Sequence, residues 1–393
     1  MLDTIILTLP VHHFRITDGS LFQPNTKGLN TPPYIARVNG VRKCVQNPTK
    51  EDERNSIYKP RLTLLSRWDG TKDFISLKIE FSIPKLLFGN NFDELSDDDF
   101  PRVIRVLKES LKDMWVIVRD GKLEKAIVSN IHYGKNIVLY DYTSVSRVLG
   151  LIAKTNISAR FDTTKTDYQN GWEAFRLHTK SFQIILYDKI ADLRKTEDRW
   201  FDKDMKGINY QMSLFEDIRK IENQQNKKSF DVLRIEVRFM NKVKLKSIYA
   251  DLGIAFADPF TFQDAFCMET ARKIVEHHWD LIMIDLKILE FMGITSVDRW
   301  NIMMRSAKKY TPTKLLALAQ LAELLSNDAY RDIRKQFEAQ YNSRSLKRLY
   351  SELKEFQGTT DTFTFIPIIH EALSLYKPLQ ISEYKYNGVN NSK

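Results

Sequence analysis

The feature that most constrains the fold is an alternation of apolar and polar residues between Trp172 and Asp192. Apolar side chains recur at every second position in two runs separated by a polar turn: Phe175 and Leu177, then Phe182, Ile184 and Leu186. A period of two is the repeat of a β-strand with one buried face. The stretch therefore predicts a β-hairpin whose second strand ends at Tyr187.

Similar strand patterns occur elsewhere in the first 250 residues. Residues 3–9 predict a first strand that ends at Pro10, and residues 61–82 predict a hairpin around Asp69 and Gly70. Two more strands are predicted around Asp120 and Gly121, and residues 233–239 predict another. In this last strand, Arg234, Glu236 and Arg238 share one face, and the intervening apolar residues share the other.

Helical patterns are interspersed with these strands. Ser96 and the three aspartates after it form a strong helix start, because a capping hydroxyl precedes acids at the positive end of the helix dipole. The buried face of this helix would contain Val103, Ile104, Leu107 and Leu111, and a second helix is predicted over TSVSRVLGLIAKT. Strands and covering helices together predict an α+β fold with an antiparallel sheet.

The last third of the chain has a different pattern. Lys242, Lys244 and Lys246 are predicted on one side of an extended basic segment, and helical periodicity dominates from Asp258 onward. We expect a domain over residues 1–250, a helical domain over residues 258–375 and a tail over residues 376–393. The helices rich in basic residues have four alternative roles. They would act as a helix-turn-helix reader of DNA, or they would instead pack on the first domain, recruit a helicase or mediate dimerisation.

Charge and composition restrict the partners. The net charge of +10 is spread along the chain, which indicates a polyanionic partner. Nucleic acid is favoured over a membrane, because no apolar run has the length of a spanning helix and the first residues do not resemble a signal peptide. The two cysteines, Cys44 and Cys267, have no CxxC partner, which predicts a reducing cytoplasm and excludes a zinc-cysteine site.

Four blocks occur in an order that resembles the replication initiators of filamentous phages, the gene II and gene X type, and their plasmid relatives. The blocks are DTIILTLP at the N-terminus, EFSIPKLLFGNN at 80–91, ILYDKIAD around Tyr187 and RIEVRF at 234–239. The resemblance covers roughly the first 250 residues. It implies an antiparallel-sheet nicking domain of the HUH, or Rep-like, kind that starts rolling-circle replication in the cytoplasm of a host cell, with host helicase and polymerase as further partners.

The resemblance implies that Tyr187 becomes covalently attached to DNA. A phenol with a pKa of about 10 is a poor nucleophile at neutral pH unless a cation or metal stabilises its phenolate. Lys189 and Asp192 follow Tyr187 closely, so we expect Lys189 to act with the tyrosine and Asp192 to lie beside it. A half-buried tyrosine with a satisfied hydroxyl is the alternative.

A divalent metal, Mg²⁺ or Mn²⁺, is implied by the same family, where an Arg-x-Asp contributes a ligand. This sequence has Asn130, Ile131 and His132 at that place, so the ligand is either His132 or the displaced Asp162 of an Arg-Phe-Asp run. Glu236 corresponds to the carboxylate that shares the metal. His13 is either a polar strand end or an additional ligand.

The basic residues near Glu236 are the predicted DNA contacts. Arg234 and Arg238 would bind the scissile or a neighbouring phosphate, since guanidinium groups suit bidentate phosphate contacts, and Lys242 and Lys244 would extend the contact. An ion-pair ladder without catalytic function is the alternative for the two arginines. The expected function is therefore metal-dependent DNA nicking and rejoining, and a non-catalytic DNA-binding protein on the same scaffold is the alternative.

Overall fold

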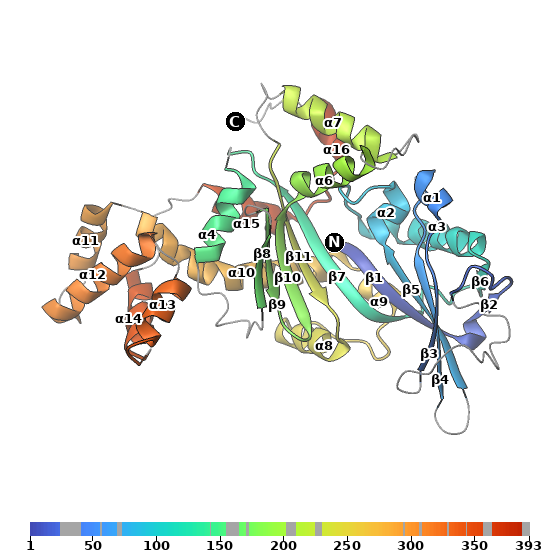
Figure 1. Ribbon diagram of the computed structural model, residues 1–393, viewed down its shortest axis with the longest axis horizontal. Helices are drawn as coiled ribbons and strands as arrows, with labels where there is room; N and C mark the ends of the chain where they lie inside the picture. The colour runs from blue at the N-terminus through green and yellow to red at the C-terminus, as the bar shows by residue number, and fades with distance from the viewer. Residues whose placement is uncertain are drawn as a thin grey trace.

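A nine-stranded antiparallel sheet forms the centre of the protein (Figure 1). The computed structural model describes residues 1–23, 41–55, 57–68, 73–141, 143–154, 165–169, 173–201, 210–224, 230–293, 295–305, 309–327, 330–342, 344–356 and 364–386. The strands lie in the order β3 (Val41–Gln46), β4 (Arg61–Trp68), β5 (Asp73–Ser82), β1 (Leu2–Pro10), β7 (Ile127–Val138), β11 (Val232–Phe239), β10 (Phe182–Asp188), β9 (Ala174–His178) and β8 (Lys165–Gln169). The prediction of an α+β fold with an antiparallel sheet is confirmed.

The two hairpins predicted from alternation both form. β9 and β10 pair around the polar turn, with Leu186 opposite Phe175, and β4 and β5 pair from Arg61 opposite Glu80 to Trp68 opposite Asp73. β10 runs one residue beyond Tyr187, to Asp188.

The strands on either side of Asp120 and Gly121 do not form a hairpin with each other. β6 (Val116–Val118) pairs with β2 (Phe14–Ile16) in a separate two-stranded sheet, whereas β7 joins the large sheet between β1 and β11. Local turn chemistry at Gly121, which has φ of 67°, permits the reversal, but the partner of each strand is set by residues far away in the sequence.

One face of the large sheet carries the main hydrophobic core. Leu7, Phe81, Tyr133, Ile235 and Leu186 are fully buried on it. Helices that contribute to the same core are α3 (Phe100–Asp113), α4 (Val145–Lys154), α8 (Lys242–Asp251), α9 (Phe262–Ala265), α10 (Met268–Gly293) and α15 (Phe365–Leu375). Side chains on the opposite face, such as Thr4, Ile6 and Thr8 of β1, are only partly buried. The sheet therefore presents an apolar face to the helices and a polar face to its surroundings.

Helix starts follow the predicted capping chemistry. Ser96 and Asp99 form a capping box at the short turn η2 (Asp97–Asp99), and α3 follows with Val103, Leu107 and Leu111 buried. α2 (Ile83–Phe88) continues directly from β5 and ends at Gly89, whose φ of 74° suits glycine. The three aspartates therefore lie at the N-terminal end of a helix, as predicted.

The segment predicted to be extended after β11 is a helix. α8 begins at Lys242 with the side chain of Asn241 as its N-cap, which accepts a hydrogen bond from the backbone N–H of Val243 at 2.7 Å. Alternating lysines suggested a strand, but Leu245, Ile248 and Tyr249 recur at helical spacing and are buried against the sheet. Packing of these three side chains outweighs the period-two charge pattern.

Two smaller cores flank the sheet. The first joins α6 (Lys189–Phe201), α7 (Tyr210–Gln224) and α16 (Ile381–Tyr386), with Ile190, Phe215 and Ile381 buried. The second joins α11 (Ser296–Arg305), α12 (Pro312–Asn327), α13 (Tyr330–Glu338), α14 (Arg344–Leu353) and η4 (Lys354–Phe356). The remaining elements are η1 (Val11–His13) and α1 (Lys50–Arg54).

The division of the chain at residues 250 and 258 stays a prediction. Phe262, Trp279 and Phe365 pack in the same core as the sheet, whereas Met303 and Leu346 belong to the separate core of α11–α14. The predicted tail includes α16, and residues 387–393 lie outside the described residues. None of the described helices is both long and apolar enough to cross a membrane.

Candidate functional site

A cavity of about 530 Å³ opens on the polar face of the sheet. It is lined by residues of β1, β5, β7, β9, β10 and β11, together with α2 and the start of α6. Its lining includes Asp3, Lys85, His132, Glu173, Arg176, Tyr187, Asp188, Asp192, Lys195, Glu236 and Arg238. We call it the sheet cavity.

Strand register brings the predicted residues together. Tyr187 of β10 lies opposite Arg234 of β11, and Arg238 of β11 lies opposite His132 of β7. Opposed residues of antiparallel strands project from the same face of a sheet. Three segments distant in the sequence therefore place Tyr187, His132 and Glu236 in the lining of a single cavity.

Glu236 is a carboxylate of the cavity with three basic side chains around it. Its side chain is buried; Nδ1 of His132 lies 3.3 Å from Oε1, and Arg238 donates from Nε at 2.8 Å and from Nη2 at 3.3 Å. Burial opposes ionisation, but the hydrogen bond from His132 and the charges of Arg238 and Arg234 hold the pKa of Glu236 well below its usual value. Glu236 is therefore an anion at neutral pH.

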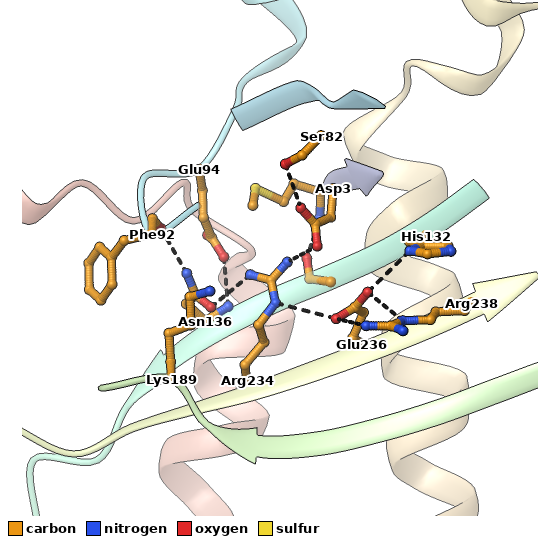
Figure 2. Close-up of polar contacts among 12 residues, drawn as sticks. Asp3, Ser82, Phe92, Glu94, His132, Asn136, Lys189, Arg234, Glu236 and Arg238 are labelled. Atoms are coloured by element: carbon orange, nitrogen blue, oxygen red, sulfur yellow. Dashed lines mark hydrogen bonds and ion pairs between the residues drawn. The ribbon is translucent and has the colours of Figure 1, made fainter. Parts of the chain in front are cut away.

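Arg234 lies beneath the cavity and has no exposed surface. Its guanidinium donates to Asn136 at 2.9 Å, lies 2.8 Å from Asp3 and lies 3.8 Å from Glu236 (Figure 2). Burial alone would lower the pKa of Arg234. Interactions with Tyr187, Asp3 and Glu236 outweigh burial, so that the pKa lies above its usual value. This arginine thus holds two carboxylates in place from within the protein, and its predicted phosphate contact stays a prediction.

A second layer supports Asn136. Glu94, which is buried, accepts from the backbone N–H of Asn136 at 2.6 Å, pairs with Lys135 and accepts from the backbone N–H of Leu379 at 3.1 Å. The amide of Asn136 also donates to the carbonyl of Phe92 at 2.7 Å. These bonds fix the carbonyl oxygen of Asn136 toward Arg234.

Tyr187 is partly buried and lines the cavity. Burial raises the pKa of its hydroxyl well above the usual value, and the nearby charge of Arg234 counteracts this shift only in part. The phenol is therefore protonated at neutral pH, and its use as a nucleophile requires a group that removes the proton.

Lys189 is the first residue of α6 and is fully buried. Its Nζ lies 5.7 Å from the centroid of the Tyr187 ring and 3.9 Å from a carboxylate oxygen of Asp192, and it makes no hydrogen bond to any residue in the described ranges. Burial, with the charge of Arg234, lowers the pKa of Lys189 to about 7. A substantial fraction of this amine is therefore neutral at neutral pH.

The other predicted site residues lie at several places. Asp192 lines the cavity. His13 lies in η1, beyond the far end of β1 from Asp3, and is not part of the lining; its pKa is lowered by burial and by its basic neighbours His12, Lys122 and Arg119. Asp162 lies outside the described residues.

Lys242 and Lys244 are held on α8 and do not line the cavity. Lys242 pairs with Asp258 at 2.8 Å, and Nζ of Lys244 lies 5.2 Å from the centroid of the Phe182 ring, at the opposite end of β10 from Tyr187. α8 packs on the apolar face of the sheet, whereas the cavity opens on the other face, so DNA bound in the cavity would not be in direct reach of α8. The contact of Lys242 and Lys244 with DNA stays a prediction.

Several cavity residues were missed from the sequence. Asp3 lies within the first block of the resemblance, DTIILTLP, which was the available signal for it. Lys85 lies on α2, and Arg176 and Lys195 come from β9 and α6, so only the tertiary fold brings them to the cavity. Lys195 pairs with Glu173, whereas neither Lys85 nor Arg176 forms an ion pair with a described residue, and Nε of Arg176 is buried without a hydrogen bond to one.

The two predicted metal ligands among the described residues, His132 and Glu236, both line the sheet cavity. An imidazole nitrogen and a carboxylate suit Mn²⁺, and a carboxylate with water suits Mg²⁺. Within the described residues there is no group of three or more His, Cys, Asp or Glu placed to hold a metal ion, so water or substrate oxygens would complete the coordination. Both oxygens of Glu236 contact Arg238, and a metal would therefore compete with that guanidinium.

Comparisons of the chain with protein-family models, with curated proteins and with solved structures give no match.

Proposed function

We propose that this chain is a replication initiator that nicks and rejoins DNA on an HUH, or Rep-like, domain with Tyr187 as its nucleophile, in the cytoplasm of a cell that hosts a phage or plasmid. One observation carries the proposal: Tyr187, His132 and Glu236 come from separate strands and line the same cavity. The net charge of +10 fits a nucleic-acid substrate. Host helicase and polymerase would act after the nick.

The proposed reaction exchanges one phosphodiester for another. The Tyr187 oxygen forms a bond to phosphorus, the bond from phosphorus to the 3′-oxygen breaks, and Lys189 takes the phenolic proton. The leaving 3′-oxygen takes a proton from water in the open cavity. The products are a 5′-phosphotyrosine and a 3′-hydroxyl, and attack by a 3′-hydroxyl on the same phosphorus rejoins the strand and returns the proton to Tyr187.

Substrate phosphates would contact the cations that line the cavity. Lys85 and Arg176 form no ion pair with any described residue, so they are available to an anion at little cost in lost protein contacts. Arg238 is partly exposed and joins them, although it also binds Glu236. We assign Arg234 a positioning role, because its guanidinium is buried and bound to Asp3 and Asn136.

A divalent metal would be held by His132 and Glu236. When bound, such an ion would withdraw charge from the phosphoryl oxygens as a Lewis acid. Asp3 and Arg234 keep Glu236 in position for this role through the 2.8 Å and 3.8 Å contacts.

The test is a covalent-adduct assay with the full chain, a labelled single strand and Mn²⁺ or Mg²⁺. We expect an adduct that survives denaturing electrophoresis, and we expect Tyr187→Phe to abolish it while DNA binding is retained. Tyr140→Phe is the matched control, since Tyr140 is 63% exposed and lies outside the cavity. An adduct in Tyr187→Phe at the wild-type level would refute the assignment.

A non-catalytic DNA-binding protein on the same scaffold is the second candidate. It is favoured by the two hydrogen bonds from Arg238 to Glu236, which occupy the carboxylate that a metal would need. This candidate predicts salt-sensitive DNA binding without an adduct at any metal concentration.

A further inference from the structure

The helices α11–α14 form a unit with a core of its own, at one end of the molecule (Figure 1). Met303, Leu318, Tyr330, Leu346 and Tyr350 are buried in it, and none of them belongs to the core of the large sheet. The sheet cavity and this unit are therefore separate parts of the protein, and a function of the unit can be tested without altering the cavity.

α14 has two opposite faces. Leu346, Tyr350 and Leu353 are buried at helical spacing, and α13 lies just before α14 in the same core. The face turned outward carries Arg344, Lys347 and Arg348, all exposed. Residues three and four apart lie next to each other on a helix, so these three cations form one patch.

Folding does not account for this patch. Within the described residues, neither Arg344 nor Lys347 takes part in an ion pair, and Arg348 pairs only with Glu352, at 3.2 Å, while 74% of its side chain stays exposed. The first turn of α14 contains no acid, although the helix dipole favours acids there. Arg344 lies at the N-terminal end of α14, where the helix dipole does not stabilise a cation. The exposed ion pair of Arg348 with Glu352 contributes at most about 1 kcal/mol to stability.

The segment between the two helices adds an exposed aromatic side chain. Tyr341 is 65% exposed, and its ring lies 5.2 Å from the ring of Phe337. From Tyr330 to Lys354 the sequence has seven basic and three acidic residues, a net charge of +4.

We propose that α13 and α14 bind duplex DNA, with the outward face of α14 in the major groove. Two consecutive helices that share one core, with a short connection between them and cations on the outer face of the second, are features of a helix-turn-helix, whose second helix enters the major groove. The positive patch is complementary in charge to the phosphates on both sides of the groove, and we expect the exposed Tyr341, in the connection before α14, to contact the backbone. This binding goes beyond the proposed nicking, since it takes a duplex and uses none of the cavity residues.

The test measures binding of the full chain to a labelled duplex of about three helical turns by anisotropy over a range of salt concentrations. The variant Arg344→Glu/Lys347→Glu should bind at least about tenfold more weakly near 0.1 M salt, and its plot of log affinity against log salt should be shallower by about 2. The milder variant Arg344→Gln/Lys347→Gln should shift both quantities in the same direction by less. Unchanged circular dichroism and thermal unfolding would show that both variants fold.

The matched control is Arg105→Glu/Lys112→Glu, which makes the same charge change on exposed positions of α3. It should leave duplex affinity within about twofold of wild type, because these residues lie outside the patch. Equal duplex affinity of wild type and Arg344→Glu/Lys347→Glu would overturn the proposal. This holds even if the variant has lost binding to an acidic protein, because the patch would then serve that protein and not DNA. Adduct formation on a short single strand reports on the cavity alone, so the two proposals can fail separately.

Discussion

Arg234 of β11 crosses Gly134 of β7 so closely that a methyl group on residue 134 would lie 2.9 Å from Nη2 and 3.2 Å from Cζ of the arginine. The guanidinium cannot move aside freely, since Nη2 is also 2.8 Å from Asp3 and the whole side chain is buried. The absence of a side chain at residue 134 is therefore a condition for the arrangement of Asp3, Arg234 and Glu236.

We predict that Gly134→Ala lowers the free energy of unfolding by about 1–3 kcal/mol, the usual cost of overpacking. It should also slow adduct formation, because a displaced Arg234 releases Asp3 and Glu236. Thermal or denaturant unfolding measures the first effect and the adduct assay the second. Gly150→Ala is the control: an added methyl group meets nothing within 4 Å on α4, so this variant should be more stable by up to about 1 kcal/mol. Equal stability of the two variants would contradict the prediction.

Competition between Arg238 and a metal for Glu236 predicts opposite effects of two substitutions. Arg238→Gln removes the donors at 2.8 Å and 3.3 Å and should tighten Mn²⁺ binding severalfold, whereas His132→Asn should weaken it by about tenfold or more. Calorimetric titration of Mn²⁺ measures both. If the two variants bind Mn²⁺ as wild type does, His132 and Glu236 are not the metal ligands.

Burial of Lys189 predicts a pH-dependent gain of stability in Lys189→Met. The pKa of this lysine falls from its ordinary 10.5 to about 7 on folding, so the unfolded chain binds more protons between these values and stability rises with pH across them. Below about pH 7 the full cost of the buried charge is present. Lys189→Met should therefore raise the free energy of unfolding by several kcal/mol near pH 6, at about 1.36 kcal/mol per pKa unit, and by progressively less toward pH 10.5.

The same lysine gives a kinetic signature. If Lys189 accepts the proton of Tyr187, the rate of adduct formation should increase with pH through about 7 in wild type and lose this dependence in Lys189→Met. Lys180→Met, in the exposed turn between β9 and β10, should retain both the wild-type stability and the wild-type pH profile. An unchanged profile in Lys189→Met would assign the proton transfer to another group.

Glu94 supports the site from below, and Glu94→Gln should be strongly destabilising. The carboxylate is 1% exposed, and it accepts from the backbone of Asn136 and Leu379 and pairs with Lys135. Loss of its charge leaves the ammonium of Lys135 buried without a counter-ion, which typically costs 3–5 kcal/mol. Glu109→Gln, an exposed position on α3, should change stability by less than about 0.5 kcal/mol in the same unfolding measurement.

Local pattern predicted much of the fold. The period of two at Phe182, Ile184 and Leu186 gave the hairpin, and the buried face at Val103, Leu107 and Leu111 gave α3, because both patterns are properties of neighbouring residues. The prediction of an extended segment at Lys242 was wrong, since the buried residues Leu245, Ile248 and Tyr249 recur at helical spacing and decide the conformation there. The separate pairing of β6 with β2 was missed, because strand partners are set by distant residues.

The candidate site could be predicted only in part. Tyr187 and Glu236 were named from two blocks of the resemblance, and His132 from the place where the family has an Arg-x-Asp; all three line one cavity. Asp3 and Lys85 lie in two of the blocks, but their place in the cavity depends on the register of β1 beside β7 and on the direction of α2, which no local pattern shows. The burial of Arg234 was also unpredictable, because it depends on the missing side chain of Gly134, two positions along the neighbouring strand from Asn136.

The bonds between Glu94 and Leu379, and between Asp93 and Ile381, join residues separated by 285 and 288 positions. A ribosome must therefore synthesise nearly all of the described chain before the strand that carries His132 and Asn136 obtains its last support. Loop closure over such distances is slow, so maturation of the site would be a late event of folding. If the chain nicks DNA as proposed, a nascent polypeptide would not do so until α15 and α16 had been made.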